Sequence, residues 1–173
     1  MRRTIRPHLI GALAALILLV VVPAALGAKP TRTVVASEPF VIPAGLGCAF
    51  DVLGEPEPDA RQAITEFSDG RIQTIGHGSG TLTNAENGES FDVRSRYKET
   101  ETPLGEGLVR FEISGRIFIS FFPGDQGPFG EVEEPGLLLE VIGHQRITAE
   151  ADTLVFTSYS LNGQATDICA QID

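Results

Sequence analysis

The sequence has no tryptophan, one methionine and only two cysteines among its 173 residues. It lacks the Cys-x-x-Cys and His-x-x-x-His spacings of metal and redox sites. It also lacks the Gly-x-Ser-x-Gly nucleophile elbow and the Lys-Ser/Thr ending of a phosphate loop. The missing tryptophan weakens any proposal of carbohydrate binding by aromatic stacking. We therefore expect no metal and no cofactor, and the absent signatures favour a non-enzymatic protein over an enzyme.

Positive charge is scarce. The chain has 13 basic and 23 acidic residues. Three arginines precede Lys29 and every acid follows it, so the part from Lys29 onward carries 10 − 23 = −13 charges. Such an acidic surface repels phosphate backbones and anionic lipid. We expect no nucleic-acid partner.

The N-terminal 28 residues have the pattern of a secretory signal peptide. Three arginines come first, Leu9 to Val22 is an unbroken apolar run, and Pro23 ends it before several small residues. The run is shorter than the roughly 20 residues of a membrane-spanning helix. We expect cleavage after Gly27 or Ala28, secretion, and no stable membrane span after processing. An uncleaved signal anchor is the alternative.

The two cysteines, Cys48 and Cys169, both follow the predicted leader. Outside the cytosol paired thiols are normally oxidised, and two cysteines allow a single intramolecular pairing. We therefore predict a structural disulfide between Cys48 and Cys169. Because it would enclose nearly the whole domain, we expect it to link the first strand to the last.

After the leader, residues 29–44 form an extended, proline-containing lead-in, with an edge strand at Val34-Val35, and residues 45–173 form a single β domain. Three dipeptides, Asp69-Gly70, Asn87-Gly88 and Asn162-Gly163, are typical of hairpin turns. The remaining predicted strands are Ala49–Leu53, Gln62–Phe67, Arg71–Ile75, Gly80–Thr83, Phe91–Lys98, Leu108–Ile113, Ile117–Phe122, Leu137–Thr148, Leu154–Tyr159 and Gln164–Ile172, the last of which contains Cys169.

Alternation of side chains supports this interpretation. From Phe91 to Lys98 the odd positions are apolar or small and the even positions are charged, so one face points to a core and the other to water. Leu108–Ile113 repeats the pattern, with Val109, Phe111 and Ile113 directed inward. Ile117–Phe122 is apolar on both faces, which predicts a strand that is central or covered.

Short, evenly spaced, turn-separated strands are typical of antiparallel barrels and sandwiches. We predict an all-β fold, an antiparallel barrel of roughly eight to nine strands, with a β-sandwich as the alternative. The barrel is favoured because the disulfide would hold its terminal strands together.

Two groups of residues are candidates for chemistry. Acids in the loop 123–136, which are Asp125, Glu131, Glu133 and Glu134, could supply oxygen ligands to Ca²⁺, although a solvated loop is favoured. An enzyme would need a buried polar cluster, for which Glu140, His144 and Tyr159 are the best candidates. His77, in the stretch Gly76–Gly80, and His144 are otherwise ordinary loop or strand residues.

Three short motifs carry a resemblance: Gly-Leu-Gly-Cys-Ala-Phe at 45–50, Gly-Arg-Ile-Phe at 115–118 leading to Phe-Pro-Gly-Asp at 122–125, and Asp-Ile-Cys at 167–169. The chain resembles a group of uncharacterised small exported proteins of actinobacteria from Gly45 to its end. That resemblance implies export and a β domain, and it supplies no site residues. A looser topological likeness is to dirigent and allene oxide cyclase barrels.

Three functions follow as hypotheses. The first is a secreted, non-enzymatic β-barrel module that binds a small apolar ligand or a protein partner, since the aromatic residues could line an interior cavity as well as fill it. The second is a lyase or isomerase acting on an apolar substrate inside the barrel. The third is a structural protein of the cell envelope.

Overall fold

The computed structural model describes residues 29–173, and the predicted signal peptide lies outside the described residues. Within them the chain is almost entirely β, which confirms the predicted fold class. The elements are β1 (Thr31–Ala36), β2 (Phe40–Ile42), β3 (Val52–Pro56), β4 (Arg61–Glu66), β5 (Ile72–Asn84), β6 (Ser90–Gly105), β7 (Leu108–Phe121), β8 (Gln126–Gly127), β9 (Gly130–Glu131), β10 (Leu137–Glu150), β11 (Phe156–Asp167) and the helix α1 (Cys169–Ile172).

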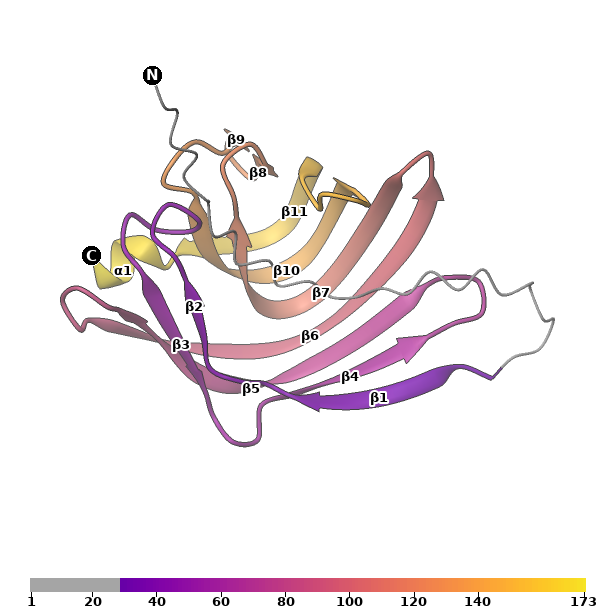
Figure 1. Cartoon of the computed structure of the whole chain (residues 1–173), viewed down its shortest axis with the longest axis horizontal. Helices are drawn as coiled ribbons and strands as arrows, with labels where there is room; N and C mark the ends of the chain where they lie inside the picture. The colour runs from indigo at the N-terminus through magenta and orange to yellow at the C-terminus, as the bar shows by residue number, and fades with distance from the viewer. Residues whose placement is uncertain (1–28) are drawn as a thin grey trace, which may run out of the picture.

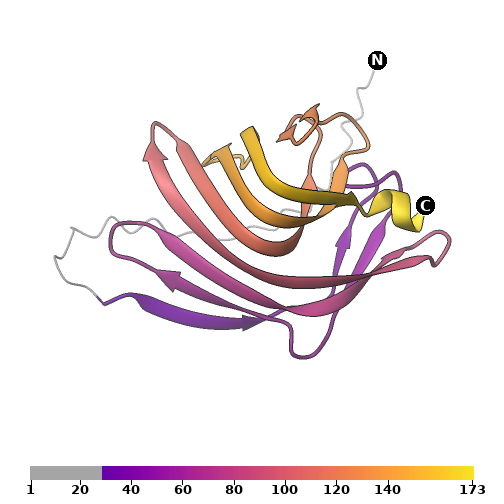
Figure 2. The ribbon, with the colours of Figure 1, turned by 180° about the vertical axis from the view of Figure 1, so that it is seen from behind.

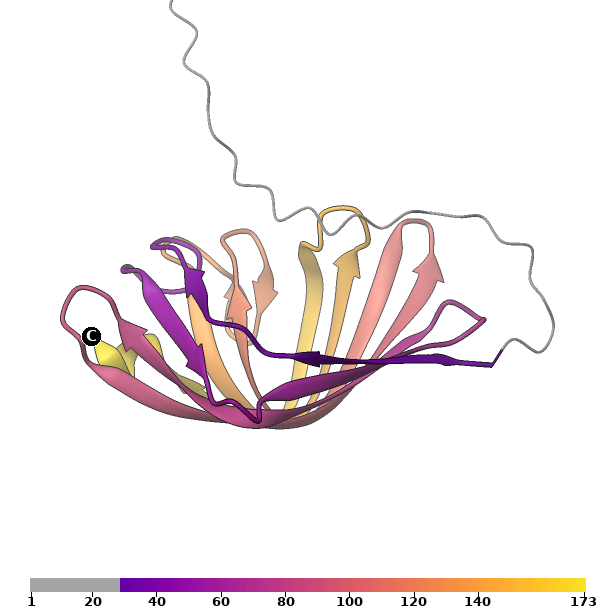
Figure 3. The same ribbon diagram turned by 60° about the horizontal axis from the view of Figure 1, so that its bottom comes forward.

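Nine of these strands form one antiparallel sheet in the order β1-β4-β5-β6-β7-β10-β11 (Figure 1). The long strand β5 branches the sheet, because its first half pairs with β4 and its second half with β3, which in turn pairs with β2. Strands β8 and β9 form a separate small hairpin. The predicted barrel is not confirmed, since β1 and β11 lie at opposite ends of the sheet, which curls into an open trough (Figure 3).

The lead-in belongs to this sheet. Strand β1 forms six backbone pairs with β4, from Thr31 opposite Glu66 to Ala36 opposite Arg61, so the edge strand predicted at Val34-Val35 is confirmed. The turns at Asp69-Gly70 and Asn87-Gly88 are also confirmed, since they join β4 to β5 and β5 to β6.

Three pairs of predicted strands are single long strands in the structure. The pieces on either side of Gly76–Ser79 form β5, and those around Gly115 form β7. The pieces around Asn162-Gly163 join in β11, which ends at Asp167, so the strand predicted as far as Ile172 is wrong beyond that point, where Cys169–Ile172 forms α1. The turn predicted at Asn162-Gly163 is therefore wrong, because both residues pair with β10 in the middle of the strand. Each glycine interrupts the side-chain pattern without interrupting the backbone ladder.

These glycines align across the sheet. The register places Gly76, Tyr97, Gly115, Gly143 and Gly163 in one row over β5, β6, β7, β10 and β11. A Cβ atom on Gly143 would clash with the carbonyl oxygen of Asn162, and one on Gly163 with that of Ile142. Glycine in a strand permits close backbone approach and sharp bending. Figure 2 shows the curved long strands of the sheet from behind.

The curvature creates two hydrophobic cores on opposite faces of β7. Phe118 packs against the first core, and Phe121 lies at the centre of the second. Strand β7 lies between β6 and β10, so the prediction that Ile117–Phe122 forms a central or covered strand is confirmed. The first core contains Cys48, Phe50, Val52, Leu82, Val93, Leu138, Ile168 and Ile172, and the second contains Phe121, Leu139 and Val141.

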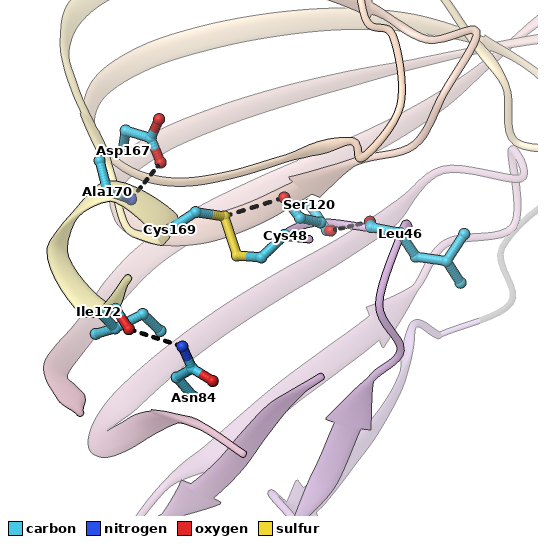
Figure 4. Close-up of a disulfide and its surroundings, with 9 residues drawn as sticks. Leu46, Cys48, Asn84, Ser120, Asp167, Cys169, Ala170 and Ile172 are labelled. Carbon is cyan, nitrogen blue, oxygen red and sulfur yellow. Dashed lines mark hydrogen bonds between the residues drawn. A yellow bond between two sulfur atoms is a disulfide. The ribbon is translucent and has the colours of Figure 1, made fainter. Parts of the chain in front are cut away.

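The Cys48–Cys169 disulfide is present, with Cα atoms 5.5 Å apart (Figure 4). Its place differs from the prediction, because Cys48 lies in the β2–β3 connection and Cys169 in α1, beyond the last strand. The bridge therefore fastens a loop to the C-terminal helix instead of closing the sheet. The Asn84 side chain donates a hydrogen bond of 2.9 Å to the carbonyl of Ile172 and holds the same helix.

The disulfide gives a first testable prediction. Its cysteines are separated by 121 residues, a loop for which the chain-entropy model gives about 5 kcal/mol, and loss of a native bridge typically costs about 2–5 kcal/mol. We expect Cys48→Ala/Cys169→Ala to lower the free energy of unfolding in urea by that amount. Reductant should destabilise the wild type to a similar extent and leave the double variant unchanged. An equal effect of reductant on both proteins would contradict the assignment.

The glycine row gives a second. We expect Gly163→Ala to lower the free energy of unfolding by about 2–3 kcal/mol, the range of an overpacked site, because the new methyl group meets the backbone of β10. Gly88→Ala is the control, since it has positive φ but open space around it, and it should cost only about 1–2 kcal/mol. If Gly163→Ala cost no more than Gly88→Ala in denaturant unfolding, the close approach would be disproved.

Candidate ligand-binding site

A hollow of about 320 Å³ opens beside strands β5 and β6. The β1–β2 connection borders it on one side and strand β7 on the other. Its lining is mainly apolar, with a few polar side chains, and includes Phe40, Gln62, Leu82, Val93, Ser95, Tyr97, Ile117 and Phe118. We call this hollow the Tyr97 pocket.

The alternation of β6 builds one wall of the Tyr97 pocket. Val93, Ser95 and Tyr97 are the odd positions of the predicted alternating strand, and the intervening charged residues are exposed, as expected. On β5 the positions opposite these three are Gly80, Gly78 and Gly76. Because this face of β5 has no side chains there, other groups can approach its backbone closely. The Tyr97 ring uses that space and lies across Gly76.

An aromatic pair forms another wall. The rings of Phe40 and Phe118 stack with centroids 5.8 Å apart and planes 11° from parallel. Phe40 comes from β2 and covers Gly54 of β3, where no side chain competes for the space. The wall thus combines a residue of the lead-in with one from the middle of the sheet.

The polar part of the pocket includes the ionisable side chains of Glu38, Glu55 and Arg61 as well as uncharged groups. Burial, and to a smaller extent the nearby Glu99 carboxylate, raises the pKa of the Tyr97 hydroxyl to about 12. The hydroxyl is therefore a neutral hydrogen-bond donor. Burial also raises the pKa of Glu99, as does the charge of Glu101, while burial alone raises the pKa of Glu101. Both acids follow Tyr97 on the same face of β6.

The three residues considered for catalysis do not meet. Glu140 lies 3.9 Å from the Arg116 guanidinium, and the His144 Nδ1 atom lies 2.9 Å from the Ser114 hydroxyl on an exposed surface. Tyr159 projects from the opposite face, where its hydroxyl donates to Gln145 Oε1. The predicted polar cluster is therefore not formed.

His77, the other histidine of residues 29–173, lines the Tyr97 pocket. The Nε2 atom of His77 accepts a hydrogen bond of 2.9 Å from Arg61 Nε, and the side chain is exposed. Its strand neighbours Gly76 and Gly78 belong to the face that borders the pocket. The sequence alone did not predict that this glycine-rich stretch borders a pocket. The sequence feature that could have indicated the pocket is a glycine at every second position of β5 from Gly76 to Gly80. These glycines lie opposite Val93, Ser95 and Tyr97 of β6.

The acidic loop contains a structural carboxylate. Asp125 is buried, and its two oxygens accept hydrogen bonds from the backbone amides of Phe122 at 2.7 Å and Phe156 at 2.8 Å. It thereby holds the loop against the start of β11. Over residues 29–173 no group of three or more potential metal ligands is found.

Comparisons with protein-family models, with curated proteins and with solved structures found no match. Among residues 29–173, no helix is both long enough and apolar enough to cross a bilayer. The site must therefore be interpreted from its own chemistry.

The tyrosines give a third testable prediction. The chain has two, and burial raises the pKa of Tyr159 to about 12, as it does for Tyr97. Because the folded-state pKa exceeds the unfolded value of about 10, the stability each contributes is complete below pH 10 and lost between about pH 10 and 12. We expect near-ultraviolet tyrosinate absorbance to appear about two pH units later in native than in urea-unfolded protein.

Tyr97→Phe separates the two groups. The variant should lose about half of the tyrosinate absorbance change and keep the late titration of Tyr159. A native wild-type titration centred near pH 10, measured where circular dichroism shows an intact sheet, would contradict the burial of both phenols.

Proposed function

We propose that the protein is a secreted, non-enzymatic β module that binds a small apolar ligand in the Tyr97 pocket. The observation that carries the proposal is a hollow of about 320 Å³ whose walls are mainly apolar and aromatic. Sites for small molecules are concave, mostly apolar and supplied with a few polar groups that fix orientation. A volume near 300 Å³ is at the small end of that range.

The chemistry of the walls indicates the ligand class. The stacked Phe40 and Phe118 rings offer a flat apolar surface. The Tyr97 hydroxyl, which is protonated at neutral pH, suits a carbonyl, ether or hydroxyl oxygen of the ligand. Two acids, Glu38 and Glu55, line the pocket with a single arginine, Arg61, and the chain as a whole is acidic, so an anionic ligand is disfavoured. The favoured ligand is small, uncharged and mainly apolar, with one acceptor oxygen.

Export is the second part of the proposal. The Cys48–Cys169 bridge is consistent with an oxidising compartment, and the predicted signal peptide supports the same location. The resemblance to small exported proteins of actinobacteria also supports it, because two of the shared motifs contain the bridged cysteines. No particular contact in residues 29–173 favours catalysis or a purely structural role in the envelope.

A neutral, environment-sensitive dye, N-phenyl-1-naphthylamine, tests the proposal. We expect a saturable rise in its fluorescence with the oxidised protein, which has no tryptophan to interfere. Ser95→Phe, which fills the Tyr97 pocket, should weaken binding at least tenfold, or by about 1.4 kcal/mol. Ser90→Phe is the matched control, since Ser90 is exposed on the same strand. Its even-numbered position places it on the face opposite to that of Ser95. Equal binding by the two variants would refute the pocket as the dye site.

Native mass spectrometry of secreted protein complements the dye experiment. An uncharged molecule that copurifies with the wild type and with Ser90→Phe, and is absent from Ser95→Phe, would identify the natural ligand class. A copurifying molecule retained by Ser95→Phe would place binding elsewhere.

A further inference from the structure

The sheet has three edge strands, and two of them are protected. Strand β1 has six residues and carries Arg32, and strand β2 has three residues and is followed directly by Pro43. Short length, charge and proline are the devices by which natural proteins prevent edge strands from pairing with other chains. These two edges are therefore poor sites for strand addition.

Strand β11 lacks the protection of short length, charge and proline, while the β8–β9 hairpin lies beside it and Asp125 accepts a hydrogen bond from the Phe156 amide at its start. It has twelve residues, contains no proline, and has no charged residue before Asp167. One side of it is paired with β10 along its whole length. Its other side is the end of the large sheet within the described residues, as Figure 1 shows for the yellow strand. The described residues carry a net charge of 10 − 23 = −13, yet this edge is long and neutral. Such an edge is a template for another strand.

A groove follows the same edge. It has a volume of about 370 Å³ and is lined by Pro128 and Phe129 of the β8–β9 hairpin and by β11 residues from Tyr159 to Ala165. The Phe129 side chain is 81% exposed, the largest value among the exposed large hydrophobic residues of the described chain. A strand added to β11 would enter this groove and cover the Phe129 ring.

We propose that the occupant is a second copy of this chain, whose β11 pairs antiparallel with the first around a two-fold axis at Asn162. In that register Leu161 of one copy lies opposite Gly163 of the other, and Tyr159 lies opposite Ala165. On the other face Ser160 lies opposite Gln164, and Asn162 meets its own equivalent. Each large side chain thus faces a small one, and polar side chains face polar ones, as cross-strand pairing favours.

Charge supports self-association at this strand. Two acidic copies repel each other over most of their surfaces, and contact is least unfavourable where neither contributes charge. Strand β11 provides eleven consecutive uncharged residues, from Phe156 to Thr166. The isologous geometry also closes the assembly, because each copy uses its single unprotected edge.

The test uses charges placed on the proposed axis. We expect the purified, oxidised wild type to sediment as a dimer in analytical ultracentrifugation. Asn162→Lys and Asn162→Asp each place like charges opposite one another, and each should raise the dimer dissociation constant at least about tenfold. An equimolar mixture of the two variants should regain the dimer, because opposite charges then meet. Thr33→Lys, on the edge strand β1, is the control and should sediment like the wild type.

Three outcomes would overturn the proposal. They are a wild type that stays monomeric at every concentration, a dimer that survives Asn162→Lys and Asn162→Asp, and a mixture of variants that does not recover. If the chain is monomeric and hydrogen exchange at β11 slows only when an extended peptide of another protein is added, the edge serves a different partner and self-association is rejected. Circular dichroism of each variant checks that the sheet is intact.

Discussion

The close backbone approach along the row of Gly76, Gly115, Gly143 and Gly163 is the constraint on which the rest of the structure depends. A single sheet buries one face against another layer, and residues 29–173 contain almost no helix to supply one. Where side chains are absent, the long strands can bend and twist enough for the sheet to cover itself. Two cores then form on opposite faces of β7, and Val132, next to the β8–β9 hairpin, packs against the second.

The disulfide completes the first of these cores. Cys48 is buried together with Val52, Leu138 and Ile168, so the bridge lies within packed apolar residues. Its partner is in a helix of one turn, which is too short to be stable without tertiary contacts. The bridge and the Asn84 hydrogen bond keep that helix against the sheet. The C-terminal helix is therefore held by contacts from outside it.

Sequence patterns predicted the local features that depend on neighbouring residues. Three features were predictable because each depends on a few adjacent residues. They are the alternation in 91–98, the strand at 117–122 that is apolar on both faces, and the turns at Gly70 and Gly88. The continuity of β11 through Asn162-Gly163 was not, since the same dipeptide suits a hairpin turn and a close strand approach. Only the facing strand, with its Gly143, distinguishes these alternatives. Whether the sheet closes depends on curvature summed over many strands, which local patterns do not encode.

The Tyr97 pocket was less accessible to sequence reasoning, because its walls come from distant parts of the chain. Phe40 belongs to a segment predicted as an extended lead-in, yet it stacks on Phe118 in the middle of the sheet. Glycine-rich β5 was recognised as unusual, but a missing side chain indicates space only when the opposite strand and the covering residues are known. Tyr97 itself was counted among the aromatic residues that fill or line an interior, and the structure places it in a pocket wall.

These features connect the covalent bridge to the pocket. Strand β2 carries Phe40 at one end and Ile42, which packs against the first core, at the other. The connection that follows β2 contains Cys48, and Ser120 donates a hydrogen bond to the Leu46 carbonyl in that connection. Tethering the connection to α1 therefore restricts β2, and with it the Phe40 ring over Gly54. Because ordering a wall before binding lowers the entropy lost on binding, the oxidised bridge would preorganise the pocket for the proposed ligand as well as stabilise the fold. The first core and one wall of the Tyr97 pocket are thus connected to the same cross-link.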